Sequence, residues 1–377
     1  MSIAAVKGAP GHYRIGEGVL KELDRLLSEL CIKKVHIVSG KKAWQAAKPY
    51  LPDEVNLLDE SLLTFIEGHC TIKKTAELAE TFTADHVDAV IGIGGGTVLD
   101  IAKASAAQSG VKSVLIPTIA ATCAAWTPLS VFYHEDGKHS HYTEFPVANT
   151  LVLVEPEIIA KAPLKYIKAG IGDTLAKYYE ADALVDAFYK NEELPVWLQV
   201  SQFTAKVCRD ILLKDGKAAI QSVESGTVSD ELIRVIETII LTGGMVGGFG
   251  NKAGRVAGAH SFHNGLTEAE ETYHFLHGEI VSYGTLLQLA LEKKENELKK
   301  LLGYYEEWGF PVNLKSFSID PDNKELLDRI IAKSLLPEES IHFMDIEITE
   351  DSVLEAFINV EKVTHRQKEL LQKEGLR

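Results

Sequence analysis

The chain has 377 residues, which is long enough for two domains, since one hydrophobic core seldom grows beyond about 250–300 residues. Apolar residues make up 46% of the sequence and charged residues 25%, as in ordinary globular proteins. The 54 acidic and 39 basic residues give a net charge of −15, which argues against nucleic acid and against an anionic membrane surface as partners.

The N-terminal residues and the cysteines indicate the compartment. Residues 1–18 lack the basic region and apolar core of a signal peptide, and no apolar run reaches the roughly 18–20 residues of a membrane helix. The cysteines are far apart and form no CxxC pair: Cys31, Cys70, Cys123 and Cys208. This usage predicts reduced thiols in a cytoplasmic protein, with neither a disulfide framework nor a cysteine zinc site.

Up to about residue 160, short apolar runs alternate with helical patterns. The runs VHIVS (35–39), VDAVIGI (87–93), SVLIP (113–117) and LVLVE (151–155) are typical of parallel strands covered on both faces. Helical patterns over 16–30 and 71–82 lie between them, and an Asp-Gly turn within 131–145 predicts a hairpin. Together they predict βαβ units in a doubly wound sheet.

The remainder of the chain has a 3.6-residue period and no strand pattern. We therefore predict an α/β dinucleotide-binding domain over 1–162 and an all-helical domain over 163–377. The segment between them, KAPLKY (161–166), is short, so we expect the two domains to pack against each other around a cleft.

A glycine-rich turn follows one of the predicted strands. In VIGIGGGTVLDIAKA, Gly94, Gly95 and Gly96 lie between an apolar strand and a helix, where free backbone N–H groups and the helix dipole attract a phosphate. A plain strand-to-helix turn would look similar, and the motif is not GxGxxG. The alternation of strand, turn, helix and strand favours a pyrophosphate site.

Side chains that suit a divalent metal lie in the helical half. Asp173 stands at a predicted helix start, His260 and His263 are one turn apart, and His277 precedes a long helix. A carboxylate with two imidazoles is a reasonable ligand set that leaves a position open for substrate. Asp173 is equally suited to be an N-cap, a histidine is often a hydrogen-bonded core residue, and spacing alone does not choose between His260 and His263.

Five motifs in this order resemble the metal-dependent alcohol dehydrogenase superfamily: GGGTVLDIAKA, PTIAAT, GIGDTLAKYYEA, AHSFHNGLT and LHGEIVSYGTL. The sequence is most similar to the glycerol dehydrogenase-like branch and, within it, to bacterial hydroxycarboxylate dehydrogenases. The resemblance implies the dehydroquinate synthase-like fold, with a nucleotide-binding α/β domain, a helical domain and a metal between them.

The resemblance also assigns the metal ligands and catalytic centre to Asp173, His260 and His277. His263 then lines the site. The iron-dependent branch has a further histidine where this chain has Lys177, so a site with Asp and two His is expected. This donor set suits Zn²⁺, and Fe²⁺ or Mn²⁺ accept the same ligand types.

Cofactor contacts follow from the same resemblance. Gly94, Gly95, Gly96 and Thr97, with Asp100 in the following helix, would hold the pyrophosphate; Thr118, Ala121, Thr127, Leu129 and Tyr133 would surround the adenine and nicotinamide ends. NAD-using members place an aspartate at the end of the first strand. Here Ser39, Gly40 and Lys41 stand there, with Lys42 following, and such residues accept a 2′-phosphate that a carboxylate repels. NADP(H) is therefore expected over NAD(H), although two lysines at a solvated helix start are an alternative explanation.

Two residues indicate the substrate. Glycerol dehydrogenases have an aspartate at the position of Cys123, and its loss removes a negative charge from the substrate site. Arg255 lies about a turn and a half before His260 on the same predicted helix, where a guanidinium can bind a carboxylate; a surface ion pair is the alternative.

The predicted function is hydride transfer between NADP(H) and a small 2-oxo acid or 2-hydroxy acid, with His260 and His263 beside the substrate and a self-associating chain. The first alternative is an NAD-dependent glycerol dehydrogenase with zinc. Dehydroquinate synthase and a non-catalytic nucleotide-binding protein are more distant. Dehydroquinate synthase needs a glutamate ligand and a Lys/Arg cluster that are not seen in this sequence. A non-catalytic protein is disfavoured by the complete set of Asp173, His260 and His277.

Overall fold

The computed structural model describes residues 6–53, 62–190 and 192–373. Contacts divide the chain into two compact units. The sheet unit comprises Lys7–Ile167 and Ala218–Gly248, and the helical unit contains Lys168–Lys217 and the chain from Phe249 onward. The sequence predicts one boundary, at 162/163, whereas the structure groups residues 218–248 with the sheet. The reason is that α9 (Asp230–Glu237), which buries one apolar face, contacts α6 (Pro156–Ala160) of the sheet unit.

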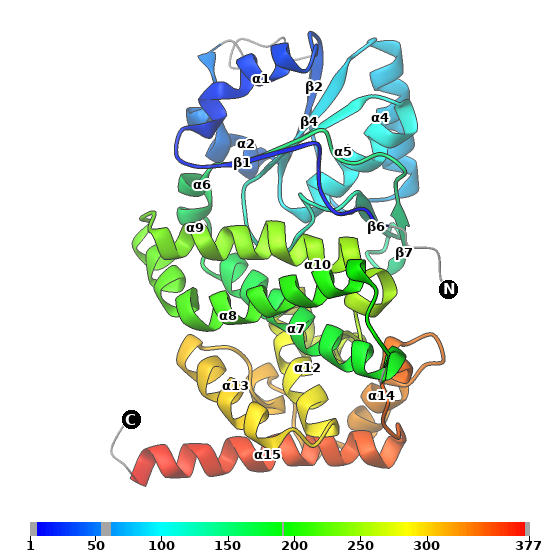
Figure 1. Ribbon diagram of the computed structural model, residues 1–377, viewed down its shortest axis with the longest axis vertical. Helices are drawn as coiled ribbons and strands as arrows, with labels where there is room; N and C mark the ends of the chain where they lie inside the picture. Colours follow the sequence, from blue (N-terminus) through cyan, green and yellow to red (C-terminus); the bar gives the residue numbers. More distant parts are fainter. Residues whose placement is uncertain (1–5, 54–61, 191, 374–377) are drawn as a thin grey trace. The chain divides into compact units, whose positions relative to one another are not determined.

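A six-stranded parallel sheet forms the centre of the sheet unit (Figure 1). Its order is β1-β8-β5-β4-β2-β3, with β1 His12–Ile15, β2 Val35–Ser39, β3 Leu63–Phe65, β4 Ala89–Gly94, β5 Lys112–Pro117 and β8 Leu151–Val154. The apolar runs correctly predict the four inner strands. The edge strands β1 and β3 are absent from the prediction because they are short and partly exposed, so neither is a continuous apolar run.

Both faces of the sheet are covered. Alternate strand residues such as Ile91 and Ile116 lie in one core cluster with Leu20 and Leu23. The other face contacts α5 (Gly96–Ser109) so closely that a Cβ on Gly92 would lie 2.7 Å from the Ala102 Cβ. This coverage explains why the inner strands are apolar on both sides.

The other elements of this unit connect the strands. They are η1 (Val19–Glu22), α1 (Leu23–Glu29), α2 (Lys41–Ala47), η2 (Lys48–Tyr50), α4 (Ile72–Ala84) and the predicted hairpin of β6 (Leu129–Tyr133) and β7 (His139–Glu144). The helical pattern over 71–82 thus corresponds to α4, and that over 16–30 divides into η1 and α1.

Within the part of the chain that the structure describes, one helical stretch, Asp230–Gly250, is long and apolar enough to cross a membrane. It joins α9, the π-helical turn η4 (Thr238–Thr242) and α10 (Gly243–Gly250). The sequence of this stretch is not a continuous apolar run, because charged residues such as Arg234 and Glu237 interrupt it, but they do not interrupt the helix. More than half of its most apolar window is buried inside the protein, as in core helices of globular proteins, so it is a weak indication of a membrane span.

The helical unit contains no strand among its described residues, as predicted. Its elements are α7 (Lys165–Phe188), α8 (Val196–Ser225), η5 (Asn251–Gly254), α11 (Gly258–Leu266), η6 (Glu270–His274), α12 (His277–Leu291), α13 (Glu295–Trp308), η7 (Leu314–Phe317), α14 (Lys324–Ser334), η8 (Ser340–Phe343) and α15 (Glu350–Lys373). Helix α12 is buried on nearly all sides and contacts α11, α13 and α15. A helix that is apolar around its whole circumference is expected at such a central place.

Candidate functional site

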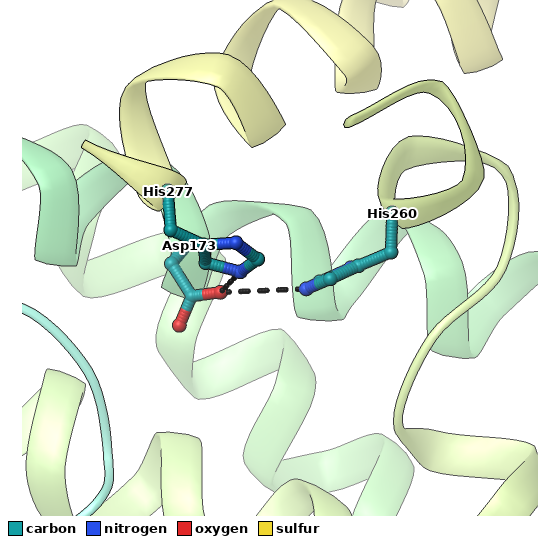
Figure 2. A group of neighbouring side chains, drawn as sticks. All are labelled: Asp173, His260 and His277. Atoms are coloured by element: carbon teal, nitrogen blue, oxygen red, sulfur yellow. Dashed lines mark ion pairs between the residues drawn. The ribbon is translucent and has the colours of Figure 1, made fainter. Parts of the chain in front are cut away.

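Asp173, His260 and His277 converge in the helical unit (Figure 2). The Oδ1 atom of Asp173 lies 3.6 Å from His260 Nε2 and 3.5 Å from His277 Nε2, and all ligand atoms lie within 4.8 Å of one another. Donors placed about 2.0–2.2 Å from Zn²⁺ at tetrahedral angles are about 3.3–3.6 Å apart. The two distances from Asp173 to the histidines therefore match those of donors that share one small divalent ion.

Glycines bring two of these candidate ligands together. Gly172 precedes Asp173 on α7, and Gly278 follows His277 on α12. A Cβ on Gly172 would lie 2.4 Å from the Gly278 carbonyl oxygen, and a Cβ on Gly278 would lie 1.9 Å from that of Ala169. Only glycine permits so close an approach of two helix backbones, and this approach places Asp173 beside His277.

Small residues likewise bring α11 to the site. Ala176, Ala259 and Val281, one from each of α7, α11 and α12, form a buried cluster. A Cβ on Gly284 of α12 would lie 2.3 Å from the Ala259 carbonyl oxygen. His260, the next residue, is thereby brought close to Asp173 and His277.

The carboxylate of Asp173 is held ionised and in one orientation. Its Oδ2 lies 3.1 Å from the Nζ of Lys177, so Oδ1 is the oxygen directed toward the histidines. Burial by itself raises the pKa of Asp173, but the Lys177 ammonium and the hydrogen bonds from His260 and His277 bring that pKa well below its usual range. Lys177 thus stabilises the ionised Asp173 carboxylate through an ion pair.

The histidines differ in protonation. Burial by itself lowers the pKa of His260, but the carboxylates of Glu180 and Asp173 raise it to about 9. Burial and the neighbouring His277 hold the pKa of His263 well below its usual value, so this ring is neutral. A metal ion at the cluster must therefore displace a proton from His260.

The site is open at one side. The side chain of Asp173 is 4% exposed and that of His260 15%, whereas that of His277 is 42% exposed. Solvent and a small ligand therefore reach the cluster beside His277, as a catalytic metal site requires.

A chain of hydrogen bonds extends from His277 away from Asp173. His277 Nδ1 lies 2.9 Å from His263 Nε2, and His263 Nδ1 lies 3.0 Å from Asn264 Oδ1. The Asn264 amide donates to both oxygens of Glu339, at 2.9 and 3.2 Å. The sequence predicts that His263 lines the site, but no local signal identifies Asn264 or Glu339 as its neighbours.

The glycine turn of the sheet unit leads directly into the N-terminus of α5. Gly94 ends β4, Gly95 is the extended N-cap of α5 and makes no side-chain cap hydrogen bond, and Thr97 is exposed in the first turn. A Cβ on Gly95 would lie 2.7 Å from Ile119 Cδ1, and one on Gly94 would lie 2.7 Å from the Cβ of Val98. The helix N-terminus is thus left without a side-chain cap, as phosphate binding needs.

Asp100, predicted beside the pyrophosphate, is buried and turned toward Lys103. The Lys103 ammonium lies 2.8 Å from Asp100 Oδ1 and donates to the carbonyl oxygens of Ala124, Thr127 and Leu129. The other carboxylate oxygen of Asp100 accepts from the backbone N–H of Val131. Lys103, which no sequence motif distinguishes, therefore links α5 to the loop that contains Cys123.

The other predicted cofactor residues lie around the ends of the strands. The Thr118 N–H donates to the Gly94 carbonyl, at 3.1 Å, and ties the loop after β5 to the glycine turn. Ala121 and Cys123 are half-buried in that loop, and the half-buried Tyr133 ends β6. Burial raises the pKa of Tyr133 above its usual value.

At the end of β2 the hydroxyl of Ser39 is buried and donates to the Ile93 carbonyl, at 2.8 Å. Gly40 is the N-cap of α2, and the exposed Lys41 lies 3.0 Å from the Glu67 carboxylate. Lys41, one of the residues predicted to discriminate between NADP(H) and NAD(H), presents its ammonium group to solvent.

Arg255 lies outside the helix that carries His260. The sequence predicts Arg255 and His260 on one helix, but α11 begins at Gly258, and Arg255 follows the 3-10 turn η5. The glycines around it break the helical period, and Arg255 lies before the helix rather than on it.

Comparison with known proteins agrees with this architecture. Residues 10–156 match the family described as iron-containing alcohol dehydrogenase. The chain is 41% identical to hydroxycarboxylate dehydrogenase A of Escherichia coli (strain K12), over 93% of this chain and 96% of that protein. It is 32% identical to a glycerol dehydrogenase of Pseudomonas putida, over 93% and 95%. The structure of a probable glycerol dehydrogenase from Sinorhizobium meliloti 1021 superposes with a TM-score of 0.83 at 25% identity, covering 97% of this chain and 100% of that chain.

Proposed function

Because this chain belongs to the iron-containing alcohol dehydrogenase family, we propose that it interconverts a small 2-oxo acid and the corresponding 2-hydroxy acid with NADP(H). It is a dehydrogenase of the class that acts on CH–OH groups and uses a metal and a nicotinamide cofactor.

The observation that carries the proposal is the convergence of Asp173 Oδ1, His260 Nε2 and His277 Nε2. These atoms would hold a divalent ion, with Zn²⁺ as the first candidate and Fe²⁺ or Mn²⁺ as alternatives. When bound, such an ion supplies Lewis-acid polarisation of a substrate oxygen. Lys177 keeps Asp173 ionised and restricts it to one ligand oxygen.

The glycine turn and its neighbours would hold the cofactor, which supplies the hydride. Gly94, Gly95, Gly96 and Thr97 present the N-terminus of α5 to the pyrophosphate, and Lys103 shapes the loop behind them. Preference for NADP(H) rests on Lys41 and Lys42, which are exposed, and on the absence of a carboxylate at Ser39. The buried Ser39 hydroxyl supports the strand end instead of the ribose phosphate.

An acidic substrate is favoured by charge. Cys123 brings no negative charge, and Arg255 brings a guanidinium suited to a carboxylate. The relative from Escherichia coli is named a hydroxycarboxylate dehydrogenase. A second candidate, an NAD-dependent glycerol dehydrogenase, is favoured by the names of other relatives that span most of this chain.

The test is a substrate panel with the purified protein. Initial rates with 2-oxobutanoate and with glycerol are measured with each nicotinamide cofactor, after chelator treatment and after readdition of Zn²⁺. We expect metal-dependent reduction of the oxo acid that is faster with NADPH. Brisk glycerol oxidation with NAD⁺ and little oxo-acid reduction would favour the second candidate. Activity unaffected by complete metal removal would overturn both.

A further inference from the structure

A buried carboxylate lies behind the metal cluster, on the side of His260 that faces away from Asp173. Glu180 of α7 is 0% exposed, and its Oε2 lies 2.8 Å from His260 Nδ1. Asp173 and Glu180 are about two turns apart on α7 and so share one face of that helix. The two ring nitrogens of His260 therefore face two carboxylates of the same helix.

The other oxygen of Glu180 is also engaged. Its Oε1 accepts from the backbone N–H groups of Ala257, at 2.7 Å, and His260, at 3.0 Å. Ala257 is the N-cap of α11 and has no side chain that could cap the helix. Glu180, which lies on α7, caps α11 instead. Both of its carboxylate oxygens therefore have defined partners, and the carboxylate has little freedom to turn.

We propose that Glu180 is a positioning residue that selects the tautomer and the ring orientation in which His260 binds the metal. The proposal rests on the metal-dependent function stated above. An ionised carboxylate only accepts hydrogen bonds, so His260 Nδ1 must carry the proton that faces Glu180. The lone pair of Nε2 is then left directed toward the place that Asp173 and His277 also face. Such carboxylate–histidine pairs orient metal ligands and raise their basicity.

The substitution Glu180→Gln tests this with almost no change in shape. Because two backbone N–H groups point at Oε1, the amide oxygen of glutamine takes that position and its NH₂ group faces His260 Nδ1. An amide donor there requires an unprotonated Nδ1 and moves the proton to Nε2, the atom needed for the metal. We expect the affinity for Zn²⁺, measured by competition with a chromophoric chelator, to fall about 10–100-fold.

A matched control is Glu361→Gln. Glu361 of α15 is a half-buried carboxylate of the helical unit that accepts from the Leu314 N–H and the Tyr283 hydroxyl and touches none of the cluster histidines. This variant should bind Zn²⁺ like the wild type. If Glu180→Gln also binds Zn²⁺ like the wild type, the role of Glu180 is overturned and the metal site stands. If the wild-type protein binds no divalent ion, the metal-dependent function fails and the role of Glu180 fails with it.

A measurement on the wild-type protein covers the case in which Glu180→Gln does not fold. Long-range ¹H–¹⁵N spectra of the Zn²⁺-loaded protein, assigned with a His260→Gln variant, report which ring nitrogen carries the proton. The proposal requires a protonated Nδ1 in His260. A protonated Nε2 in that ring would overturn it.

Discussion

His277 Nδ1 lies 2.9 Å from His263 Nε2, and this contact joins an exposed metal-ligand candidate to a neutral, half-buried imidazole. If Nε2 of His277 binds the ion, Nδ1 carries a proton and donates it to His263. His263 then donates from Nδ1 to Asn264, whose amide donates to Glu339. Every donor in this chain thus faces an acceptor.

Removing the acceptor should weaken metal binding. The substitution His263→Phe keeps a planar ring but leaves the His277 Nδ1–H without its partner. We expect about a 10-fold loss of Zn²⁺ affinity, at the lower end for such partners, because water can replace His263 beside the exposed His277. His365→Phe on α15, an exposed histidine far along the chain, is the control. Equal Zn²⁺ affinity of His263→Phe and wild type would contradict the expected support.

A carboxylate at Cys123 should repel an acidic substrate. By resemblance to glycerol dehydrogenases this position otherwise holds an aspartate, so we expect Cys123→Asp to lower kcat/KM for 2-oxobutanoate at least about 10-fold, which corresponds to about 1.4 kcal/mol. The exposed Cys31 offers the same substitution elsewhere in the sheet unit, and Cys31→Asp should leave kcat/KM unchanged. Unchanged oxo-acid kinetics in Cys123→Asp would remove this residue from the substrate argument.

Loss of the Lys103 ammonium should destabilise the sheet unit. Lys103 is 2% exposed, pairs with Asp100 and donates to carbonyl oxygens of the Cys123 loop. Lys103→Met leaves a buried carboxylate and those carbonyls without a cation, a change that costs about 3–5 kcal/mol. Urea unfolding measures the loss.

The pair Lys206–Asp210 on α8, which is largely exposed, supplies the comparison. Lys206→Met should change the free energy of unfolding by less than about 1 kcal/mol. The double substitution Asp100→Asn with Lys103→Met should be less harmful than Lys103→Met alone, because it removes the uncompensated charge. A stability of Lys103→Met equal to that of Lys206→Met would refute the anchoring role.

Lys41 should matter more for NADPH than for NADH. Its ammonium is exposed at the end of β2 beside Glu67, where a 2′-phosphate is expected. We expect Lys41→Ala to raise KM for NADPH about 10-fold, as loss of one charge-assisted contact of about 1.5 kcal/mol would do, and to leave KM for NADH nearly unchanged. Lys73→Ala, on the exposed face of α4, should alter neither KM. Parallel changes for both cofactors in Lys41→Ala would argue against recognition of the phosphate.

His36 should make the sheet unit sensitive to mild acid. Burial lowers the pKa of His36 below 6.5, although Asp85 opposes the shift, and His36 Nε2 lies 2.8 Å from the Thr64 hydroxyl oxygen. Below pH 6.5 the unfolded chain therefore binds a proton that the folded chain does not, so stability falls as the pH falls, by at most about 1.4 kcal/mol per pH unit for one group.

Urea unfolding between pH 5 and pH 8 measures this contribution. His36→Gln keeps a polar side chain beside Thr64 and removes the titration, so its unfolding free energy should depend less steeply on pH than that of the wild type. The exposed His365 serves as the control, since His365→Gln should keep the wild-type slope. An unchanged slope in His36→Gln would show that another group causes the acid sensitivity.

The order of elements and the ligand types are determined by the sequence itself, because each depends on local patterns. Strands such as Val35–Ser39 and Leu151–Val154 follow from continuous apolar runs, and a glycine turn follows from its place between a strand and a helix. Edge strands such as His12–Ile15 are not predicted, because short and half-exposed segments lack that pattern.

Only the tertiary structure decides which side chains meet. Asp173, His260 and His277 come from three helices, and their approach depends on backbone contacts at glycines and on a cluster of small residues that no periodicity reveals. In the sequence, Glu180 and Lys103 are ordinary charged residues within helical patterns. Their structural roles become visible only from their burial and their partners. Residue types are read from the chain, whereas distances arise from packing between segments far apart in sequence.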